Sequence, residues 1–465
     1  MIRLALPTGD LRRDTAALLD GAGLGIADYA GGSRALRFPM LDGAGVARVF
    51  REKDIPVQVA LGNYDAGICS LSWVEELAQR FPSHEVMRVC GLGYAGHALW
   101  LATAPNGEAD ASVRIVSEYP QIAETIARRL RLRRYRVFPV WGAAEAYPPE
   151  DADVALIASR DAAAVEAHGL RPLARVLETS AWLIVNKHSL ASRDLSPLLS
   201  PLLAAGAVAS AAPSLSLPAS LELRETPRRK PRTRLRLALP DGHAQSHTIA
   251  ALQAAGLCVD GYEDGAVVRR PRIDVDGVDV KVIRPQDMPQ QVAIGQFDLA
   301  VTGRDWLFDH LVQFPSSPVE EIVDLRRSRY GLAAIVKDVQ ADTVRGAVNE
   351  WRARSNAPIR VASEYPNIAD HFARVRQFGR YSVIPIAGAS EGFVPDDAEI
   401  LIEGIETGSS VRANRLTVLE RFFESTNCVI ANKRRPEGVL RAVFDALVER
   451  LAAGAAEPVA AGGGA

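Results

Sequence analysis

The residues best suited to chemistry lie in the segment IETGSSVRANRL, at positions 405–416. It follows the apolar, strand-like run Ile400–Ile402, and Glu403 stands directly after that run. Backbone N–H groups of such a turn can converge on an anion, and Gly408 lets the backbone approach it closely. Further hydrogen-bonding hydroxyl groups come from Thr407, Ser409 and Ser410. The turn suits a phosphate group, although Ser- and Gly-rich turns also occur without ligands. Residues 417–420 after it have a helical pattern.

The composition excludes several other chemistries. The 465-residue chain is 48% hydrophobic and 24% charged, with a formal net charge of -2, so it has no general attraction to nucleic acid or membranes. Its four cysteines and eight histidines are scattered without metal-ligand spacing, which argues against structural zinc and disulfides and fits a reducing cytosol. The N-terminus lacks the pattern of a signal peptide, and the Pro-rich stretch 195–221 is typical of a linker rather than a membrane span. We expect a soluble, cytoplasmic protein of two to four domains.

Comparing the sequence with itself reveals a tandem duplication. The motif RLALP occurs at 3–7 and again at 236–240, an offset of 233, whereas SEYP occurs at 117–120 and 363–366, an offset of 246. Because the offset grows between these blocks, we expect an insertion in the second copy near residues 341–356. The expected organisation is a first copy at 1–190, a linker at 191–233, a second copy at 234–450 and a disordered tail at 451–465.

Within each copy, short β-branched runs alternate with helical patterns. Such alternation predicts βαβ units and an α/β fold with mostly parallel sheets. Ligands bind to such sheets outside the carboxyl ends of the strands, at the strand-to-helix turns. The segment 405–416 is one of these turns.

The order of several blocks resembles the catalytic subunit of ATP phosphoribosyltransferase. The blocks are LRLALPDG, RPQDMP, DLAVTGRD, RVASEYPN and IETGSSVRANRL, and they cover about 234–450, with a weaker version at about 1–190. The resemblance implies two-lobed units like type II periplasmic binding proteins. In the second copy, one lobe would span about 234–335 with a return near 425–450, and the other about 357–424. Because only about 30 residues follow Lys433, the resemblance implies the short form, without the histidine-sensing domain.

The family reaction joins N1 of the adenine of ATP to C1 of 5-phosphoribosyl 1-diphosphate (PRPP) and releases pyrophosphate, with Mg2+ present. It is the first step of histidine biosynthesis. Its catalysis is mainly positioning and electrostatics, so we assign no protein nucleophile, and Mg2+ would be held mostly by substrate phosphates. The resemblance also implies a regulatory partner similar to histidyl-tRNA synthetase. The family unit dimerises, so the tandem chain could form a homo-oligomer or reproduce that dimer within itself.

The resemblance assigns roles to residues of the second copy. Glu403 would accept hydrogen bonds from the ribose hydroxyls of PRPP, and the following turn would bind its 5-phosphate. The PRPP-binding candidates are Glu403, Glu406, Thr407, Gly408, Ser409 and Ser410. The candidates for ATP or pyrophosphate are Asp241, Gly242, Arg284, Gly303, Arg304, Arg329 and Tyr365. Plainer roles remain open: a structural ring for Tyr365, a helix-cap role at Arg304, a solvated charge for Arg329, and an N-cap for Asp287.

The two copies differ at the phosphate turn. Thr407 corresponds to Asp161 in the first copy, and Gly408 to Ser410 correspond to Ala162 to Ala164, so we expect that the first copy no longer binds PRPP and serves as scaffold or regulator. The second copy also departs from the family, because Asp241-Gly242-His243 replaces the usual Lys-Gly-Arg. Asp241 would then need a metal or a neighbouring arginine to tolerate phosphate. The alternative to an active enzyme is therefore a non-catalytic nucleotide- or phosphosugar-binding protein.

Overall fold

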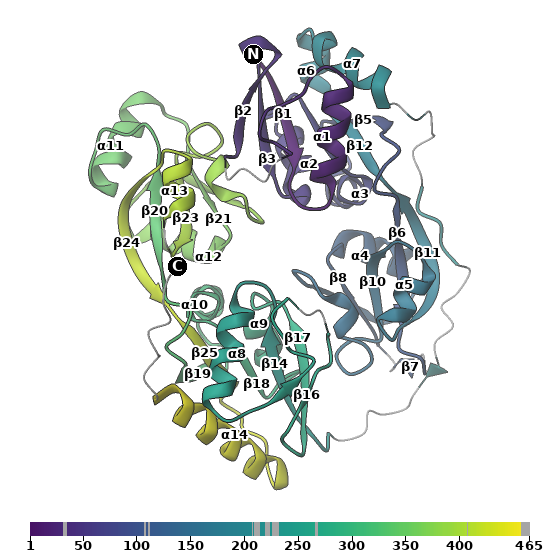
Figure 1. Cartoon of the computed structure of the whole chain (residues 1–465), viewed down its shortest axis with the longest axis vertical. Coiled ribbons are helices and arrows are strands. Elements are labelled where there is room, and N and C mark those ends of the chain that lie inside the picture. The colour runs from purple at the N-terminus through teal and green to yellow at the C-terminus, as the bar shows by residue number, and fades with distance from the viewer. Residues whose placement is uncertain are drawn as a thin grey trace.

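The chain folds into four α/β lobes, which follow one another around a ring in Figure 1. The structure is a computed structural model, and it describes residues 1–30, 35–106, 108–109, 112–206, 208, 214–218, 224–225, 232–265, 268–406 and 408–456. Lobes 1 and 2 belong to the first copy, and lobes 3 and 4 to the second. Within the described ranges, no helix combines the length and apolar composition needed to span a bilayer.

The first copy contains a six-stranded and a five-stranded sheet. Lobe 1 has the strand order β2-β3-β1-β4-β12-β5, and lobe 2 has β11-β6-β10-β8-β9. Lobe 1 comprises β1 (Ile2–Pro7), α1 (Leu11–Gly21), β2 (Arg37–Met40), η1 (Leu41–Gly43), β3 (Gly45–Phe50), η2 (Glu52–Asp54), α2 (Ile55–Ala60), β4 (Ala66–Ser70), α3 (Leu71–Arg80), β5 (Val86–Gly91), β12 (Ala181–Asn186), α6 (Lys187–Ser192) and α7 (Ser196–Gly206). Lobe 2 comprises β6 (His97–Thr103), β8 (Val113–Ser117), α4 (Pro120–Arg129), β9 (Tyr135–Pro139), η3 (Ala144–Ala146), β10 (Val154–Ser159), α5 (Ala162–Ala167) and β11 (Arg171–Thr179). A small pair joins β7 (Glu108–Ala109) and β13 (Arg224–Glu225).

The second copy repeats this architecture with two five-stranded sheets, ordered β17-β14-β18-β25-β19 in lobe 3 and β22-β21-β23-β20-β24 in lobe 4. Lobe 3 comprises β14 (Leu235–Pro240), α8 (Ala244–Ala254), β15 (Val259–Asp260), β16 (Arg272–Ile273), β17 (Val278–Ile283), α9 (Met288–Ala293), β18 (Leu299–Gly303), α10 (Arg304–Gln313), β19 (Val319–Asp324), β25 (Asn427–Asn432) and α14 (Val439–Ala456). Lobe 4 comprises β20 (Tyr330–Val336), α11 (Val344–Arg354), β21 (Ile359–Ser363), α12 (Pro366–Val375), β22 (Tyr381–Pro385), η4 (Ser390–Gly392), β23 (Ile400–Ile405), α13 (Ser409–Ala413) and β24 (Thr417–Ser425).

The central strands are near-continuous apolar runs because helices cover both faces of their sheets. In lobe 3, β14 pairs in parallel with β17 and β18, whereas the returning strand β25 is antiparallel to β18. The chain leaves lobe 3 after β19 and returns through β25, so two crossing segments join the lobes. The predicted fold class, a tandem repeat of a two-lobed unit like type II periplasmic binding proteins, is confirmed. The additional segment expected near residues 341–356 corresponds to α11, which lies between β20 and β21.

Three expectations about elements need correction. Residues 417–420, expected to be helical, belong to β24, which pairs antiparallel with β20. The boundary between lobes 3 and 4 lies before β20 rather than near residue 335. The strand β20 is part of the sheet of lobe 4, and α11 packs in the hydrophobic core of that lobe. Residues 196–206, inside the expected linker, form α7, whose Leu198 and Leu202 are buried in lobe 1.

The C-terminal helix also extends beyond its expected end. We expected disorder from residue 451, but α14 runs to Ala456 and buries Leu451 against lobe 3. The remaining residues, 457–465, lie outside the described part of the chain.

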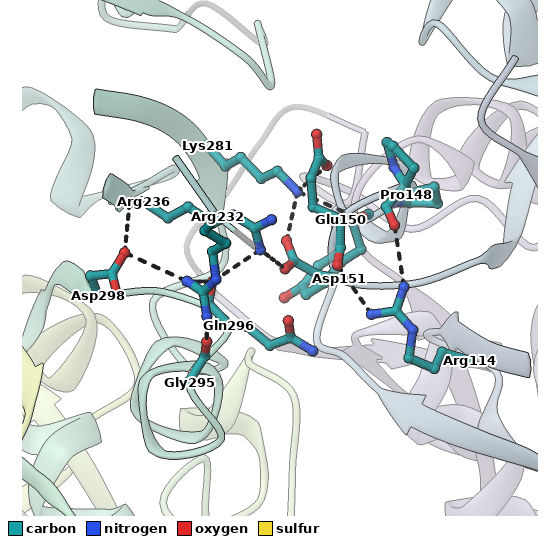
Figure 2. A network of polar contacts seen from close by, with 12 residues as sticks. Arg114, Pro148, Glu150, Asp151, Arg232, Arg236, Lys281, Gly295, Gln296 and Asp298 are labelled. Carbon is teal, nitrogen blue, oxygen red and sulfur yellow. Dashed lines mark hydrogen bonds and ion pairs between the residues drawn. The ribbon is translucent and has the colours of Figure 1, made fainter. Parts of the chain in front are cut away.

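The two copies contact each other through equivalent residues. At the junction of lobes 2 and 3, the buried Asp151 accepts hydrogen bonds from Lys281 (2.6 Å) and Arg236 (2.7 Å), as Figure 2 shows. At the junction of lobes 4 and 1, the equivalent Asp397 pairs with Arg48 at 3.3 Å. Because Asp151 and Asp397 differ by the offset of 246, and Arg48 and Lys281 by 233, the two junctions are reciprocal. The two copies thus meet at two equivalent junctions within one chain.

Candidate ligand-binding cleft

A cavity of about 420 Å3 lies between lobes 3 and 4, next to the two segments that cross between these lobes. Most of its walls are turns that follow the carboxyl ends of β14, β17, β18, β21 and β23. Its lining residues are Asp241, Gly242, His243, Ala244, Arg284, Pro285, Gln286, Gly303, Trp306, Ser328, Tyr330, Glu364, Tyr365, Glu403, Gly404, Glu406 and Asn427. We call this cavity the second-copy cleft.

A pair of aromatic rings forms an apolar wall of the second-copy cleft. The ring of Tyr365, just before α12, lies 4.3 Å from that of Trp306 on α10, at an interplanar angle of 34°. Trp306 also approaches Trp141 of the first copy, with ring centroids 5.9 Å apart. Tyr365 is 5% exposed, and burial raises its pKa well above the usual value, so its hydroxyl group stays protonated. The wall can pack against a flat, apolar ligand surface without supplying charge.

Two neighbouring carboxyl groups, those of Glu364 and Glu403, also line the second-copy cleft. Glu403 lies near the end of β23, and its Oε1 accepts a hydrogen bond from the N–H of Gly404 (3.0 Å). No described residue makes a hydrogen bond of ordinary geometry to its buried Oε2, although the side chain of Ser390 lies close enough to the carboxyl group to lower its pKa. Burial and the charge of Glu364 raise the pKa of Glu403, and burial also raises the pKa of Glu364, against the charges of Arg51 and Lys53. A buried acceptor without a donor is unfavourable, so this atom suits a ligand hydroxyl group.

Asp241, the residue in place of a usual lysine, is neutralised by two arginines. Its carboxylate accepts hydrogen bonds from Arg269 (2.7 Å) and Arg284 (3.1 Å). Arg269 also donates to Glu145 in lobe 2 (2.7 Å), so the first copy helps to hold this group. Asp241 was expected to need a metal or a neighbouring arginine, and the fold brings two arginines there.

The turn after β23 differs from its counterpart in the first copy. Gly408 adopts a positive φ of 69° at the N-cap of α13 and makes no side-chain cap hydrogen bond. A Cβ atom at Gly408 would lie 3.4 Å from Nη1 of Arg412, so a guanidinium group stands beside the turn. In the first copy, the carboxylate of Asp161 accepts a hydrogen bond from the N–H of Ala164 (2.8 Å). The N–H of Ala164 is therefore already bound by a carboxylate, whereas Gly408, the N-cap of α13, has no side chain that could accept such a hydrogen bond.

The sequence model described as ATP phosphoribosyltransferase matches residues 51–204 and 284–453, one segment in each copy. These segments make up more than half of the chain. The chain belongs to the ATP phosphoribosyltransferase family.

Individual members of the family are more distant. The chain is similar to an ATP phosphoribosyltransferase of Chlorobium phaeovibrioides, with 31% identity over 202 residues, covering 43% of this chain and 64% of that protein. A relative of the same name from Saccharolobus solfataricus is 29% identical over 202 residues, with the same shares covered. The chain thus spans less than two thirds of the length of these relatives. A solved ATP phosphoribosyl transferase (HisG:HisZ) complex from Thermotoga maritima has a TM-score of 0.39 and 18% identity, covering 44% of this chain and 98% of that one.

In this member of the ATP phosphoribosyltransferase family, the second-copy cleft brings together only some of the predicted site residues. Those that line it are Asp241, Gly242, Arg284, Gly303, Tyr365, Glu403 and Glu406. Gly408, Ser409 and Ser410 follow Glu406 but are not part of the lining, and Thr407 lies outside the described residues. Arg304 instead pairs with Glu321 at 2.7 and 2.8 Å. Arg329 is mostly exposed and pairs with Glu424.

Several lining residues were not singled out from the sequence. Glu364 lies in the SEYP block that both copies share, so its motif was visible although only the adjacent tyrosine was chosen. Ser328 and Asn427 come from the crossing segments, where no local pattern marks a ligand site. Asp287, expected as an N-cap, stands at the N-cap position of α9, but its carboxylate accepts from the N–H of Trp141 in the other copy (3.0 and 3.2 Å).

The corresponding cleft of the first copy is lined by four acidic residues, as the second-copy cleft is, but by three lysine or arginine residues rather than one. A cavity of about 500 Å3 is lined by Thr8, Gly9, Asp10, Arg51, Glu52, Lys53, Trp73, Glu118, Trp141, Arg284, Gln286, Glu364 and Ala387. Burial raises the pKa of Glu52 and of Glu118 to about 7. Arg284, Gln286 and Glu364 also line the second-copy cleft, so the two cavities meet at the junction of the copies.

Proposed function

We propose that the second copy is the catalytic unit of an ATP phosphoribosyltransferase. It joins N1 of the adenine of ATP to C1 of PRPP and releases pyrophosphate, the first step of histidine biosynthesis. The observation that carries this proposal is the buried Oε2 of Glu403, an acceptor without a hydrogen bond of ordinary geometry from the described residues, in a cleft that also holds basic and aromatic groups. Membership in the family supports the same reaction.

In this proposal, the chain acts by holding two substrates in line. Glu403 accepts hydrogen bonds from the ribose hydroxyl groups of PRPP, and the turn of Gly408, Ser409 and Ser410, with Thr407, binds the 5-phosphate. The side chain of Arg284 faces the diphosphate, while the wall of Tyr365 packs against the adenine ring. Such an arrangement accelerates the reaction by positioning and by stabilising the departing negative charge.

The residues of the second-copy cleft fit a magnesium ion. Mg2+ prefers oxygen ligands and is commonly held by one or two carboxylates together with substrate phosphates. Glu364 and Glu403 are neighbouring carboxyl groups that line this cleft, and burial raises the pKa of each, so a dication would favour their ionised forms. When bound, Mg2+ would neutralise the charge of the diphosphate.

The deciding experiment measures pyrophosphate release with ATP, PRPP and Mg2+. We expect turnover, either alone or after addition of a regulatory subunit similar to histidyl-tRNA synthetase. The variant Glu403→Gln should reduce turnover strongly, because an amide group offers one acceptor in place of two. Its matched control is Glu399→Gln in the same lobe, which removes a partner of Arg360 outside the cleft. Absence of turnover under both conditions, together with measurable PRPP binding, would contradict the catalytic proposal.

The phosphate turn has a separate test. Changing Ser409 and Ser410 together to alanine should weaken PRPP binding by roughly 1–3 kcal/mol if both hydroxyl groups bind the phosphate. Isothermal titration calorimetry with PRPP measures this difference directly. The variant Asp161→Ala, at the corresponding turn of the first copy, should leave the affinity unchanged. Equal affinities of the wild type and the double variant would contradict the assignment of this turn.

A second function is favoured by one specific observation. Asp241 uses both Arg269 and Arg284 as partners, so fewer positive groups are available to a polyphosphate than in a cleft with lysine at this position. A non-catalytic protein that binds a nucleotide or a phosphosugar would tolerate this loss better than an enzyme would. PRPP or ATP binding without turnover is the outcome that would favour it.

A further inference from the structure

The mouth of the second-copy cleft holds three side chains with the chemistry of metal ligands. His243 and His247 lie four residues apart at the start of α8 in lobe 3, and therefore share one face of the helix. Glu406 comes from lobe 4, directly after β23. Nε2 of His243 lies 3.5 Å from Oε2 of Glu406, and the imidazole rings of the two histidines are 5.5 Å apart. One ligand atom from each residue can be chosen so that all three lie within 4.8 Å of one another.

We propose that His243, His247 and Glu406 bind a transition-metal dication, of the class of Zn2+ or Co2+, and so link lobes 3 and 4 across the mouth of the second-copy cleft. Zinc binds imidazole nitrogen at about 2.0–2.1 Å and carboxylate oxygen at about 2.0–2.2 Å, so neighbouring ligand atoms in a tetrahedral site are about 3.4 Å apart. The separation of His243 and Glu406 is close to this value at 3.5 Å, and a ring nitrogen of His247 lies within 4.8 Å of both ligand atoms. Two imidazoles favour such a metal over Mg2+, which prefers oxygen.

The surroundings permit both entry of the ion and an open coordination position. The side chains of His243 and Glu406 are 67% and 49% exposed. Both residues also line the cleft, so a fourth ligand can be water or a ligand oxygen. Because the ligands come from two lobes, an ion bound here holds the lobes in the arrangement seen in the structure.

The first copy shows that this set is specific to one cleft. The positions corresponding to His243 and His247 carry Asp10 and Asp14, and the position corresponding to Glu406 carries Arg160. An arginine in place of the carboxylate repels a cation. Among the described residues this is the one such group of three ligands, so a stoichiometry of one ion is expected.

The test is a titration of the untagged full chain, stripped of metal with a chelator, using Zn2+ in calorimetry and Co2+ in visible absorption spectroscopy. We expect one equivalent of either ion to bind, with the intense ligand-field bands of a low-coordinate Co2+ site and an increase in Tm with Zn2+. His247→Ala and His243→Ala should each weaken binding at least about tenfold, which corresponds to the loss of one ligand. His188→Ala, an exposed histidine of lobe 1, is the matched control and should bind like the wild type.

Unchanged metal affinity in His247→Ala, or no binding of Zn2+ by the wild type at micromolar concentrations, would overturn the inference. The titration needs neither ATP nor PRPP, so its outcome is independent of the proposed reaction. Binding of Zn2+ without turnover would support the metal site and contradict the catalytic proposal. Turnover without binding of Zn2+ would support the catalytic proposal and contradict the metal site.

Discussion

The pair Glu364 and Glu403 is the residue-scale feature with the clearest consequence for ligand binding. Burial and the charge of Glu364 raise the pKa of Glu403, so its ionised form is disfavoured near neutral pH. A carboxylate that accepts hydrogen bonds from two ribose hydroxyl groups must first lose its proton. We therefore predict that the affinity for PRPP increases with pH as Glu403 ionises, and that Glu364→Gln moves this increase to lower pH because it removes the neighbouring charge.

Calorimetric titration with PRPP from about pH 6 to about pH 9 measures the shift, and this range also covers the second ionisation of the phosphate group. Glu391→Gln, which changes a more distant carboxyl group, controls for the general loss of a negative charge. Identical profiles for Glu364→Gln and the wild type would show that the two carboxyl groups do not interact in the cleft.

The site could be predicted from the sequence where the residues directly follow strands. Asp241, Arg284, Tyr365 and Glu403 all follow apolar runs, and the parallel sheets bring these turns to one cleft. Arg269 could not be found in this way, because its partners Asp241 and Glu145 belong to different copies and meet only in the folded chain. Arg304 illustrates the opposite case, since a residue after a strand end can turn toward its own sheet.

At the scale of elements, β24 shows why periodicity was misleading. Its apolar residues do not alternate, because the pairing with β20 shifts by one residue at two places, near Leu419 and Phe422. Each bulge moves the following side chain to the other face of the sheet. The spacing of apolar residues along β24 therefore resembles the spacing in a helix. The alternation of strands and helices was sufficient for the fold class, but not for elements whose pairing is irregular.

The helix α7 provides a test at this scale, because its segment was expected to be a linker. Leu198 is fully buried in the core of lobe 1, whereas Leu203 on the same helix is 38% exposed. We predict that Leu198→Ala lowers the free energy of unfolding by about 2–5 kcal/mol and that Leu203→Ala changes it by less than about 1 kcal/mol. Urea unfolding followed by tryptophan fluorescence measures both, and equal effects would mean that α7 does not pack as described.

At the scale of the whole molecule, the reciprocal junctions bury ionisable groups between the copies. Asp54 in lobe 1 accepts a hydrogen bond from the N–H of Ala387 in lobe 4 (3.0 Å), and the equivalent Asp287 accepts from Trp141. Burial raises the pKa of Asp54 from 3.8 to about 7. The folded chain therefore holds a proton that the unfolded chain has released over this interval. Stability contributed by Asp54 is fully present below about pH 4 and is lost as the pH rises to about 7.

We predict that Asp54→Asn removes this decline, because asparagine keeps an acceptor for Ala387 and carries no ionisable proton. The variant should resemble the wild type near pH 4 and exceed its stability near pH 8 by about 1–3 kcal/mol. Urea unfolding at both pH values measures the difference. Asp65→Asn, which changes another buried aspartate of lobe 1 that is not at the junction, is the control. A stability difference that does not widen with pH would mean that Asp54 is ionised at the junction throughout, with Lys53 as its effective partner.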